Sequence, residues 1–266
     1  MQRKATIQLW KKEVRRLKFQ CLTFSVKLLY FESWIVNSIP FLYHMKKFAV
    51  IVAGGAGTRM KNSTPKQFLF LHGQPLLWYT IQAFLQAYDD IHIILVLPAV
   101  HIHSEMVQAL LNERVTTTAG GETRFHSVRN GVSMIEEESI IFVHDGVRCL
   151  VSTELIHRCY NAALEVGSAI PVVPIKESVR LLNEEDSEAI DRNRVVTVQT
   201  PQTFHSRILL PAFDIDYKER FTDEATVVET YGLRISLVLG EEHNIKITRP
   251  MDLLIAEALL AEVHAG

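Results

Sequence analysis

The sequence predicts an α/β fold in which a mostly parallel central sheet is flanked by helices. Two features of the chain support this prediction. Short runs rich in β-branched residues are almost continuously apolar, which is typical of strands covered on both faces. Amphipathic stretches lie between these runs, and the order of strand, helix and strand favours parallel pairing through right-handed crossovers.

Local signals set the boundaries of the predicted elements. A proline precedes the first and last helices, a Gly-Gly turn precedes the second, and the third opens with Ser152-Thr153 and ends at Gly167. The predicted strands are Phe48–Ala53, Ile91–Leu97, Ile140–His144, Ala169–Val173 and Arg234–Leu239. The predicted helices are Leu76–Tyr88, Thr123–Ile135, Ser152–Glu165 and Met251–Val263.

One stretch departs from this alternation. Residues 176–194 include ten charged residues among nineteen, and short β-like pieces (Ser178–Leu182 and Val195–Thr200) accompany them. The stretch is predicted to leave the sheet, either as a solvated hairpin or as an arm at about 176–198 that reaches a partner.

Composition excludes several classes of protein. The chain has 266 residues, with 28 Lys and Arg against 30 Asp and Glu, so it lacks the basic excess of a nucleic-acid-binding surface. Its three cysteines (Cys21, Cys149 and Cys159) form no CxxC pair and are too few for a disulfide framework. We therefore expect a reducing, cytoplasmic environment and no nucleic-acid partner.

The first 44 residues differ from the rest. They hold eight Lys or Arg, two Glu and no glycine. Their apolar part is interrupted by Lys27 and Glu32, so it falls short of the roughly 18 uncharged apolar residues of a spanning helix. We expect no membrane anchor, an extension over residues 1–44 outside the fold, and a single domain over residues 45–266.

A glycine-rich turn, Ala53-Gly54-Gly55-Ala56-Gly57-Thr58-Arg59-Met60, follows the first predicted strand. Met60 stands where a dinucleotide fingerprint has its third glycine, and no Gly-Lys-Ser/Thr completes a P-loop. Two cations, Arg59 and Lys66, flank the turn instead. Paired cations beside exposed backbone N–H groups suit a triphosphate, because phosphoryl transfer depends on positioning and charge neutralisation.

Together with Pro65-Lys66-Gln67, this turn resembles the signature of nucleotidyltransferases that attach a nucleoside monophosphate to a sugar or polyol phosphate. Further segments narrow the resemblance to the 2-C-methyl-D-erythritol 4-phosphate cytidylyltransferases of the non-mevalonate isoprenoid pathway, in the same order over residues 47–263. This resemblance implies a Rossmann-like nucleotidyltransferase fold with a protruding β-arm. The segments are Gly120-Gly121-Glu122-Thr123-Arg124 with Ser127-Val128, Val143-His144-Asp145-Gly146-Val147-Arg148, Gln199-Thr200-Pro201-Gln202-Thr203-Phe204, Thr222-Asp223-Glu224-Ala225, and Asn244 to Leu253.

The resemblance also implies roles for individual residues. Arg59 and Lys66 would stabilise the triphosphate, while Arg192 and Lys246 would position the acceptor phosphate, so these four cations are the catalytic candidates. The CTP-binding candidates are Ala53, Gly54, Gly55, Gly57, Gly121, Glu122, Arg124 and Ser127. The acceptor-binding candidates are Asp145, Ser178, Arg192, Thr222 and Lys246.

Asp145 is also the metal candidate, because it follows an apolar strand at the edge where such sheets bind ligands. Mg²⁺ takes one or two protein carboxylates together with substrate phosphate oxygens, so Mg²⁺ is the expected cofactor. Lys246 lies between Ile245 and Ile247, and on a strand it would face opposite to them. The resemblance further implies a homodimer in which the arm carries Ser178 and Arg192 to the neighbouring subunit's site.

Two positions depart from the family pattern. Cys149 replaces the proline that usually follows Arg148, and Glu122 stands where the family often has Asp. Three other functions remain open. Ribitol 5-phosphate could be the acceptor in place of methylerythritol 4-phosphate, the glycine turn could serve an NAD-dependent oxidoreductase, or the chain could be an inert nucleotide-binding regulator.

Overall fold

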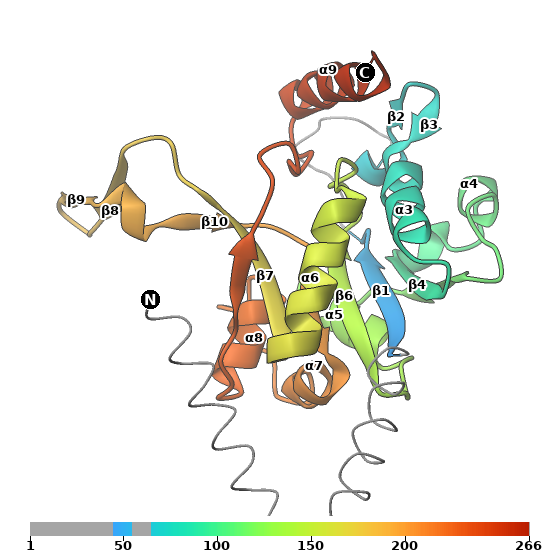
Figure 1. The fold of residues 1–266 in the computed structure, drawn as a ribbon, viewed down its shortest axis with the longest axis horizontal. Coiled ribbons are helices and arrows are strands. Elements are labelled where there is room, and N and C mark those ends of the chain that lie inside the picture. Colours follow the sequence, from blue (N-terminus) through green and yellow to red (C-terminus); the bar gives the residue numbers. More distant parts are fainter. Residues whose placement is uncertain (1–44, 55–64, 266) are drawn as a thin grey trace, which may run out of the picture. The chain divides into compact units, whose positions relative to one another are not determined.

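The computed structural model describes residues 45–54 and 65–265 (Figure 1). The expected extension over residues 1–44, and the glycine-turn residues Gly55, Gly57 and Arg59, lie outside the described part. Within the described chain, no helix combines the length and the apolar character that crossing a membrane requires.

The described residues form an eight-stranded sheet in the order β10-β7-β11-β6-β1-β4-β5, with β12 also paired to β7. β1 lies between β4 and β6 and is parallel to both, and β4 is parallel to β5. β11 runs antiparallel between β6 and β7. The strands are β1 (Lys46–Val52), β4 (Ile91–Leu97), β5 (Val115–Ala119), β6 (Ser139–Asp145), β7 (Ser168–Pro174), β10 (Val196–Val198), β11 (Gln202–His205) and β12 (Leu237–Leu239).

Helices cover both faces of this sheet, as predicted. Side chains of β6 alternate between the two layers: Ile141 belongs to the core with α5, α7 and α8, whereas the Phe142 ring contacts Phe84 of α3 and Tyr160 of α6. The helices are α3 (Leu76–Ala87), α4 (Glu105–Gln108), α5 (Arg124–Val132), α6 (Thr153–Val166), α7 (Ser206–Ala212), α8 (Glu224–Thr230) and α9 (Pro250–Ala265). Short 3-10 helices are η2 (Lys66–Phe68), η3 (Ala99–His101) and η4 (Arg192–Arg194), and β2 (Phe70–Leu71) pairs with β3 (Gln74–Pro75).

Capping residues explain where the helices begin. The side chains of Thr123, Ser152 and Asp223 each accept a hydrogen bond from a backbone N–H in the first turn of α5, α6 and α8. α6 ends at Gly167, whose φ of 92° lies in the left-handed region that favours glycine. Ser152 and Gly167, which predict the two ends of α6, are therefore the residues that cap it in the structure.

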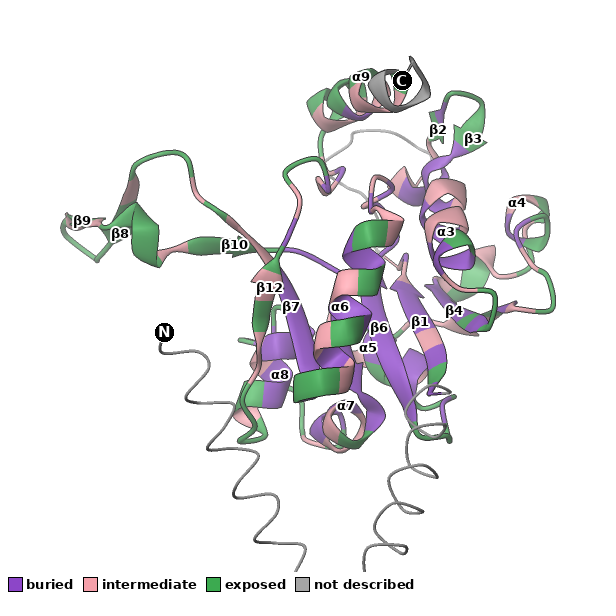
Figure 2. Cartoon of the chain, viewed as in Figure 1, coloured by how far each residue is buried: buried purple, intermediate pink, exposed green. Residues whose placement is uncertain are grey.

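A hairpin leaves the sheet after β7. Its strands β8 (Val179–Leu182) and β9 (Ser187–Ile190) pair with each other, and the chain returns through η4 and β10, which pairs with β7. Figure 2 shows that this arm is largely exposed along its length. Leu182 and Val198 are among its exposed apolar side chains.

Several elements differ from the sequence prediction. The sequence predicts neither β5 nor β11, because Thr-rich and Gln-containing segments lack an apolar run, yet β11 is buried over its whole length. The helices α7 and α8 were also missed; at seven residues each, they are too short to show clear periodicity. The predicted strand Arg234–Leu239 is shorter than expected, because pairing begins only at Leu237.

Candidate active site

The carboxyl ends of three strands bring the predicted nucleotide loops and Asp145 to one edge of the sheet. Val52 of β1 is in register with Asp145 of β6. The backbone N–H of Ala53 donates to the Val96 carbonyl at 2.9 Å, and that of Gly120 donates to the Leu97 carbonyl at 2.8 Å. Ligands of α/β sheets bind at this edge.

Gly121 and Ser127 form a compact corner after β5. The Gly121 N–H donates to Ser127 Oγ at 3.1 Å, and Ser127 Oγ donates to the Thr123 carbonyl at 3.0 Å. A Cβ on Gly121 would lie 2.4 Å from His126 Cβ, so this position has room only for glycine. A Cβ on Gly54 would lie 3.7 Å from Ser127 Oγ, which places the β1 turn beside this corner. Glu122 is exposed next to it.

Lys66 is anchored to the end of β1 through its neighbour. It is half-buried at the start of η2, and the next residue, Gln67, is buried. Gln67 Nε2 donates to the Ala53 carbonyl at 2.7 Å. The predicted cation therefore lies on a turn fixed to the strand that precedes the glycine-rich segment.

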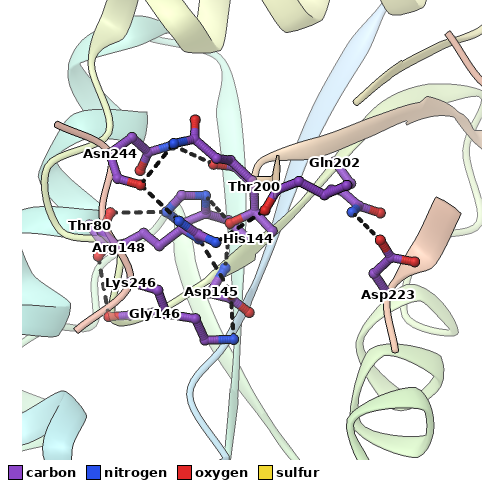
Figure 3. Close-up of polar contacts among 12 residues, drawn as sticks. Thr80, His144, Asp145, Gly146, Arg148, Thr200, Gln202, Asp223, Asn244 and Lys246 are labelled. Atoms are coloured by element: carbon purple, nitrogen blue, oxygen red, sulfur yellow. Dashed lines mark hydrogen bonds and ion pairs between the residues drawn. The ribbon is translucent and has the colours of Figure 1, made fainter. Parts of the chain in front are cut away.

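Asp145 is the centre of a cluster of cations (Figure 3). Its carboxylate is buried and lies 2.9 Å from Lys246 Nζ, 3.3 Å from Arg124 Nη2 and 3.4 Å from Arg148 Nε. Burial alone would raise the pKa of Asp145, but the three cations outweigh it and hold the pKa well below its usual range. Asp145 is thus an ionised carboxylate at neutral pH.

The backbone of Asp145 is fixed by a chain of hydrogen bonds. Its N–H donates to Thr200 Oγ1 at 3.1 Å, and Thr200 Oγ1 lies 3.0 Å from His144 Nδ1. His144 Nε2 lies 3.2 Å from the Arg148 carbonyl, which can only accept, so Nε2 carries the hydrogen and Nδ1 accepts from Thr200. Burial lowers the pKa of His144 to about 4, in keeping with a neutral imidazole.

Arg148 ties this corner to the segment that carries Lys246. Its Nη1 donates to the Asn244 carbonyl at 2.8 Å, and Asn244 Nδ2 donates to the Thr200 carbonyl at 2.8 Å. These contacts give Arg148 a supporting role in this corner of the structure. Lys246 does not lie on a strand, because residues 240–249 have no regular structure. Ile247 is nevertheless buried, and the neighbouring Lys246 contacts Asp145.

Sequence analysis missed a buried carboxylate on α8. Glu224 is 1% exposed and forms a bidentate ion pair with Arg124. Burial raises the pKa of Glu224, and the adjacent Arg124 opposes this shift. Glu224 lay within a segment that carried the family resemblance, but a charged residue in a short unrecognised helix gave no sign of burial.

The structure separates the arm residues from this cluster. Ser178 and Arg192 are exposed, and Arg192 Nη1 donates to the Lys176 carbonyl within the arm at 2.6 Å. Thr222 is exposed just before α8. The described contacts therefore join Lys246 to Asp145 but leave Ser178 and Arg192 outside the same chain's cluster.

Asp145 suits a metal that a substrate helps to hold. Among the described residues, no group of three or more His, Cys, Asp or Glu side chains could bind a metal ion. An ionised carboxylate at the ligand-binding edge of the sheet fits Mg²⁺, which commonly combines one or two protein carboxylates with phosphate oxygens.

Comparison with known proteins places these residues in a family. The family model for 2-C-methyl-D-erythritol 4-phosphate cytidylyltransferase (IspD) matches residues 47–262. A protein of that name from Phocaeicola vulgatus is 45% identical over 222 residues, covering 81% of this chain and 100% of its own. One from Porphyromonas gingivalis is 44% identical and covers 81% of this chain and 98% of its own.

Solved structures give the same result. The crystal structure of 2-C-methyl-D-erythritol 4-phosphate cytidylyltransferase from Thermus thermophilus has a TM-score of 0.66 and 30% identity, covering 82% of this chain and all of that chain. The 4-diphosphocytidyl-2C-methyl-D-erythritol synthase of Anaerococcus prevotii shares the fold, with a TM-score of 0.71 over 82% of this chain and 96% of that one. This chain is therefore a member of the 2-C-methyl-D-erythritol 4-phosphate cytidylyltransferase family.

Proposed function

We propose that this protein transfers CMP from CTP to 2-C-methyl-D-erythritol 4-phosphate, giving 4-diphosphocytidyl-2-C-methyl-D-erythritol and pyrophosphate for isoprenoid precursor synthesis. The observation that carries the proposal is the Asp145 cluster, in which Lys246 and two arginines surround one carboxylate beside the glycine corner. Family membership over residues 47–262 supports the choice of donor and acceptor.

The reaction needs positioned charge more than a general base. The acceptor phosphate has a second pKa of about 6 and is largely a dianion at neutral pH. One of its oxygens attacks the α-phosphorus of CTP and forms a new P–O bond. The bond from the α-phosphorus to the oxygen bridging the β-phosphorus breaks, and pyrophosphate leaves with the electron pair. Arg59 and Lys66 neutralise the developing charge, while Lys246 orients the attacking phosphate.

The glycine corner accounts for selection of the base. Backbone groups of Ala53, Gly54 and Gly121, braced by Ser127, present hydrogen-bonding atoms at close range because side chains are small or absent there. A pyrimidine fits such an approach better than a purine. Gly55, Gly57 and Arg59 complete the nucleotide site in this proposal, with Glu122 and Arg124 at its border.

Mg²⁺ is the cofactor in this proposal. Asp145 would hold it together with the triphosphate. When bound, the ion neutralises phosphate charge and favours departure of pyrophosphate. Lys246 contacts the same carboxylate and is partly exposed, so its ammonium group is placed to contact the acceptor phosphate.

The active form is a homodimer in this proposal. Arg192 and Ser178 are exposed on the arm, away from their own chain's Asp145 cluster, which suits delivery to a neighbouring subunit. Exposed Leu182 and Val198 supply apolar surface for the contact. We also propose a cytoplasmic location, in keeping with the free thiols of Cys149 and Cys159.

The test of this function is pyrophosphate release by the full-length protein with Mg²⁺ and CTP. We expect release with 2-C-methyl-D-erythritol 4-phosphate and a much lower rate with ribitol 5-phosphate or with ATP in place of CTP. Release with ribitol 5-phosphate alone would keep the chemistry and change the acceptor. Absence of release with both acceptors would contradict the proposal.

A further inference from the structure

Glu224 is a buried carboxylate for which the proposed reaction has so far given no role. It is 1% exposed, and the described hydrogen bonds of its carboxylate are to Arg124: one to Nη1 and one to Nη2 at 3.2 Å. Removing a carboxylate from water is unfavourable, and a close cation offsets that cost. Glu224 is paired with Arg124, which itself contacts Asp145, so its carboxylate lies next to the Asp145 cluster.

The position of Glu224 is set by β11. Gln202 Nε2 donates to Asp223 Oδ2 at 2.9 Å, and Gln202 Oε1 accepts from the Ala225 N–H at 2.8 Å. Asp223 in turn caps α8 by accepting from the Thr226 N–H at 2.9 Å. Both neighbours of Glu224 are thus held by a buried side chain of the central sheet, which fixes the direction of the carboxylate.

Arg124 bridges Glu224 and Asp145. Glu224 takes Nη1 and Nη2 in the closer, bidentate contact. Asp145 Oδ1 receives longer contacts from Nε at 3.4 Å and Nη2 at 3.3 Å. The guanidinium of Arg124 is therefore held mainly by Glu224, and its contacts with Asp145 are longer.

Because Glu224 and Asp145 share the Arg124 guanidinium, the charge of Glu224 affects Asp145. Without the charge of Glu224, the guanidinium would keep a single carboxylate partner, and attraction would draw it closer to Asp145. A tighter Arg124–Asp145 pair would compete with any cation that the carboxylate must accept. Glu224 therefore affects the site by keeping the Arg124 guanidinium from pairing more closely with the Asp145 carboxylate.

We infer that Glu224 is a positioning residue that, by seating Arg124, keeps the Asp145 carboxylate oriented and available to the divalent cation carried by CTP. This inference rests on the proposed function. It predicts that loss of the Glu224 charge weakens binding of the metal–nucleotide complex without changing the acceptor site formed around Lys246.

The experiment measures Mn²⁺ binding in the presence of CTP and absence of acceptor, by electron paramagnetic resonance, together with the Mg²⁺ concentration for half-maximal pyrophosphate release. Glu224→Gln keeps the shape and removes the charge. We expect the apparent Mn²⁺ dissociation constant and the Mg²⁺ requirement to rise about 10-fold, as for other residues that orient a metal ligand, with the KM for the acceptor unchanged.

Matched variants separate this role from a structural one. Glu229→Gln removes an exposed carboxylate from the same helix and should leave all parameters unchanged. Glu224→Asp keeps the charge and should stay within about twofold of the wild type. In an Arg124→Gln background, the further change Glu224→Gln should have no additional effect, because Glu224 acts through Arg124.

The inference would be overturned by a folded Glu224→Gln protein with wild-type Mn²⁺ affinity and Mg²⁺ requirement. It would also be overturned if Glu224→Gln lowered the Mn²⁺ affinity as much in the Arg124→Gln background as in the wild type. If Glu224→Gln does not fold, Arg124→Lys tests the same coupling, since an ammonium cannot span both carboxylates; it should also raise the Mn²⁺ dissociation constant. A wild-type protein that binds Mn²⁺ with CTP but releases no pyrophosphate would contradict the proposed function and leave the Mn²⁺ comparison valid.

Discussion

Lys246 Nζ lies 2.9 Å from Asp145 Oδ2, although the two residues are a hundred positions apart in the chain. Asp145 is buried, whereas Lys246 is partly exposed. The Lys246 ammonium group therefore contacts the carboxylate and is also accessible to solvent. That arrangement allows Lys246 to exchange a protein partner for a substrate phosphate.

Lys246→Ala should therefore lower kcat/KM for the acceptor by about 10²–10³-fold, because a preorganised donor to the reacting phosphate is lost. Unfolding temperature should change little, since Arg124 and Arg148 still neutralise Asp145. Steady-state pyrophosphate release checks the first point and thermal unfolding the second. Lys218→Ala, at an exposed lysine distant from the cluster in sequence, is the control.

Arg59→Ala and Lys66→Ala should each fold normally and lose turnover by about 10²-fold or more, because both cations are assigned to the triphosphate. Circular dichroism checks folding, and single-turnover release of pyrophosphate checks the chemical step. Retained turnover in both variants would remove these residues from the nucleotide site.

Mixing two inactive variants tests whether the arm serves a neighbour. Lys246→Ala and Arg192→Ala should each be inactive alone. In a mixed dimer, one site combines the intact Lys246 of one chain with the intact Arg192 of the other, so mixing after mild dissociation should restore about a quarter of wild-type activity. Activity that stays at the level of the separate variants would show that Arg192 does not act across subunits.

Gly121→Ala should raise the KM for CTP about 10-fold or more and lower stability by about 1–3 kcal/mol, because the new Cβ would overlap His126 and force the corner apart. Gly73→Ala provides a matched control. Gly73 has a φ of 82° and no heavy atom within 4 Å of a Cβ, so the substitution should strain a remote turn without affecting CTP. Isothermal titration with CTP distinguishes the two variants.

His205 should make stability depend on pH. Its Nδ1 accepts from the Arg207 N–H at 3.2 Å at the start of α7, so the cap requires a neutral ring. Burial, and then the charge of Arg207, lower the pKa of His205, while Glu138 opposes them. The unfolded chain therefore binds a proton that the folded chain does not, and stability falls as the pH drops below the ordinary value of 6.5.

His205→Asn keeps a capping side chain and removes the titration. Urea unfolding at pH 7 and pH 5 should show a smaller loss of stability on acidification for this variant than for the wild type. An equal loss in both proteins would indicate that His205 is protonated alike in the folded and unfolded states.

Sequence patterns predicted the strands that carry the nucleotide corner and Asp145 because those strands are apolar and end in recognisable turns. Ile91–Leu97 agrees with β4 at both ends. Patterns failed at β11, whose polar residues are buried by pairing with β6 and β7. Such burial comes from contacts between distant segments, which a local window does not contain.

The same reason explains which site residues were found. Ser127 and Gly121 lie six residues apart, so a helix start alone predicts that they meet. Glu224 and Arg124 lie a hundred residues apart, and their pairing depends on α8 being seated by Gln202. Lys246 and Asp145 are likewise distant in the chain, and their contact is not contained in either local pattern.

The order of the site segments along the chain has a practical consequence. Among the described residues, the proposed nucleotide contacts come from residues 53–54, 66 and 120–127, whereas the proposed acceptor contacts come from the arm and the Lys246 segment. In this proposal, donor and acceptor recognition are encoded in successive parts of the chain. A chimaera that exchanges only residues 176–198 and 240–249 with a relative of different acceptor preference should retain CTP and accept the new polyol phosphate, which makes this fold a suitable starting point for redesigning cytidylyl transfer.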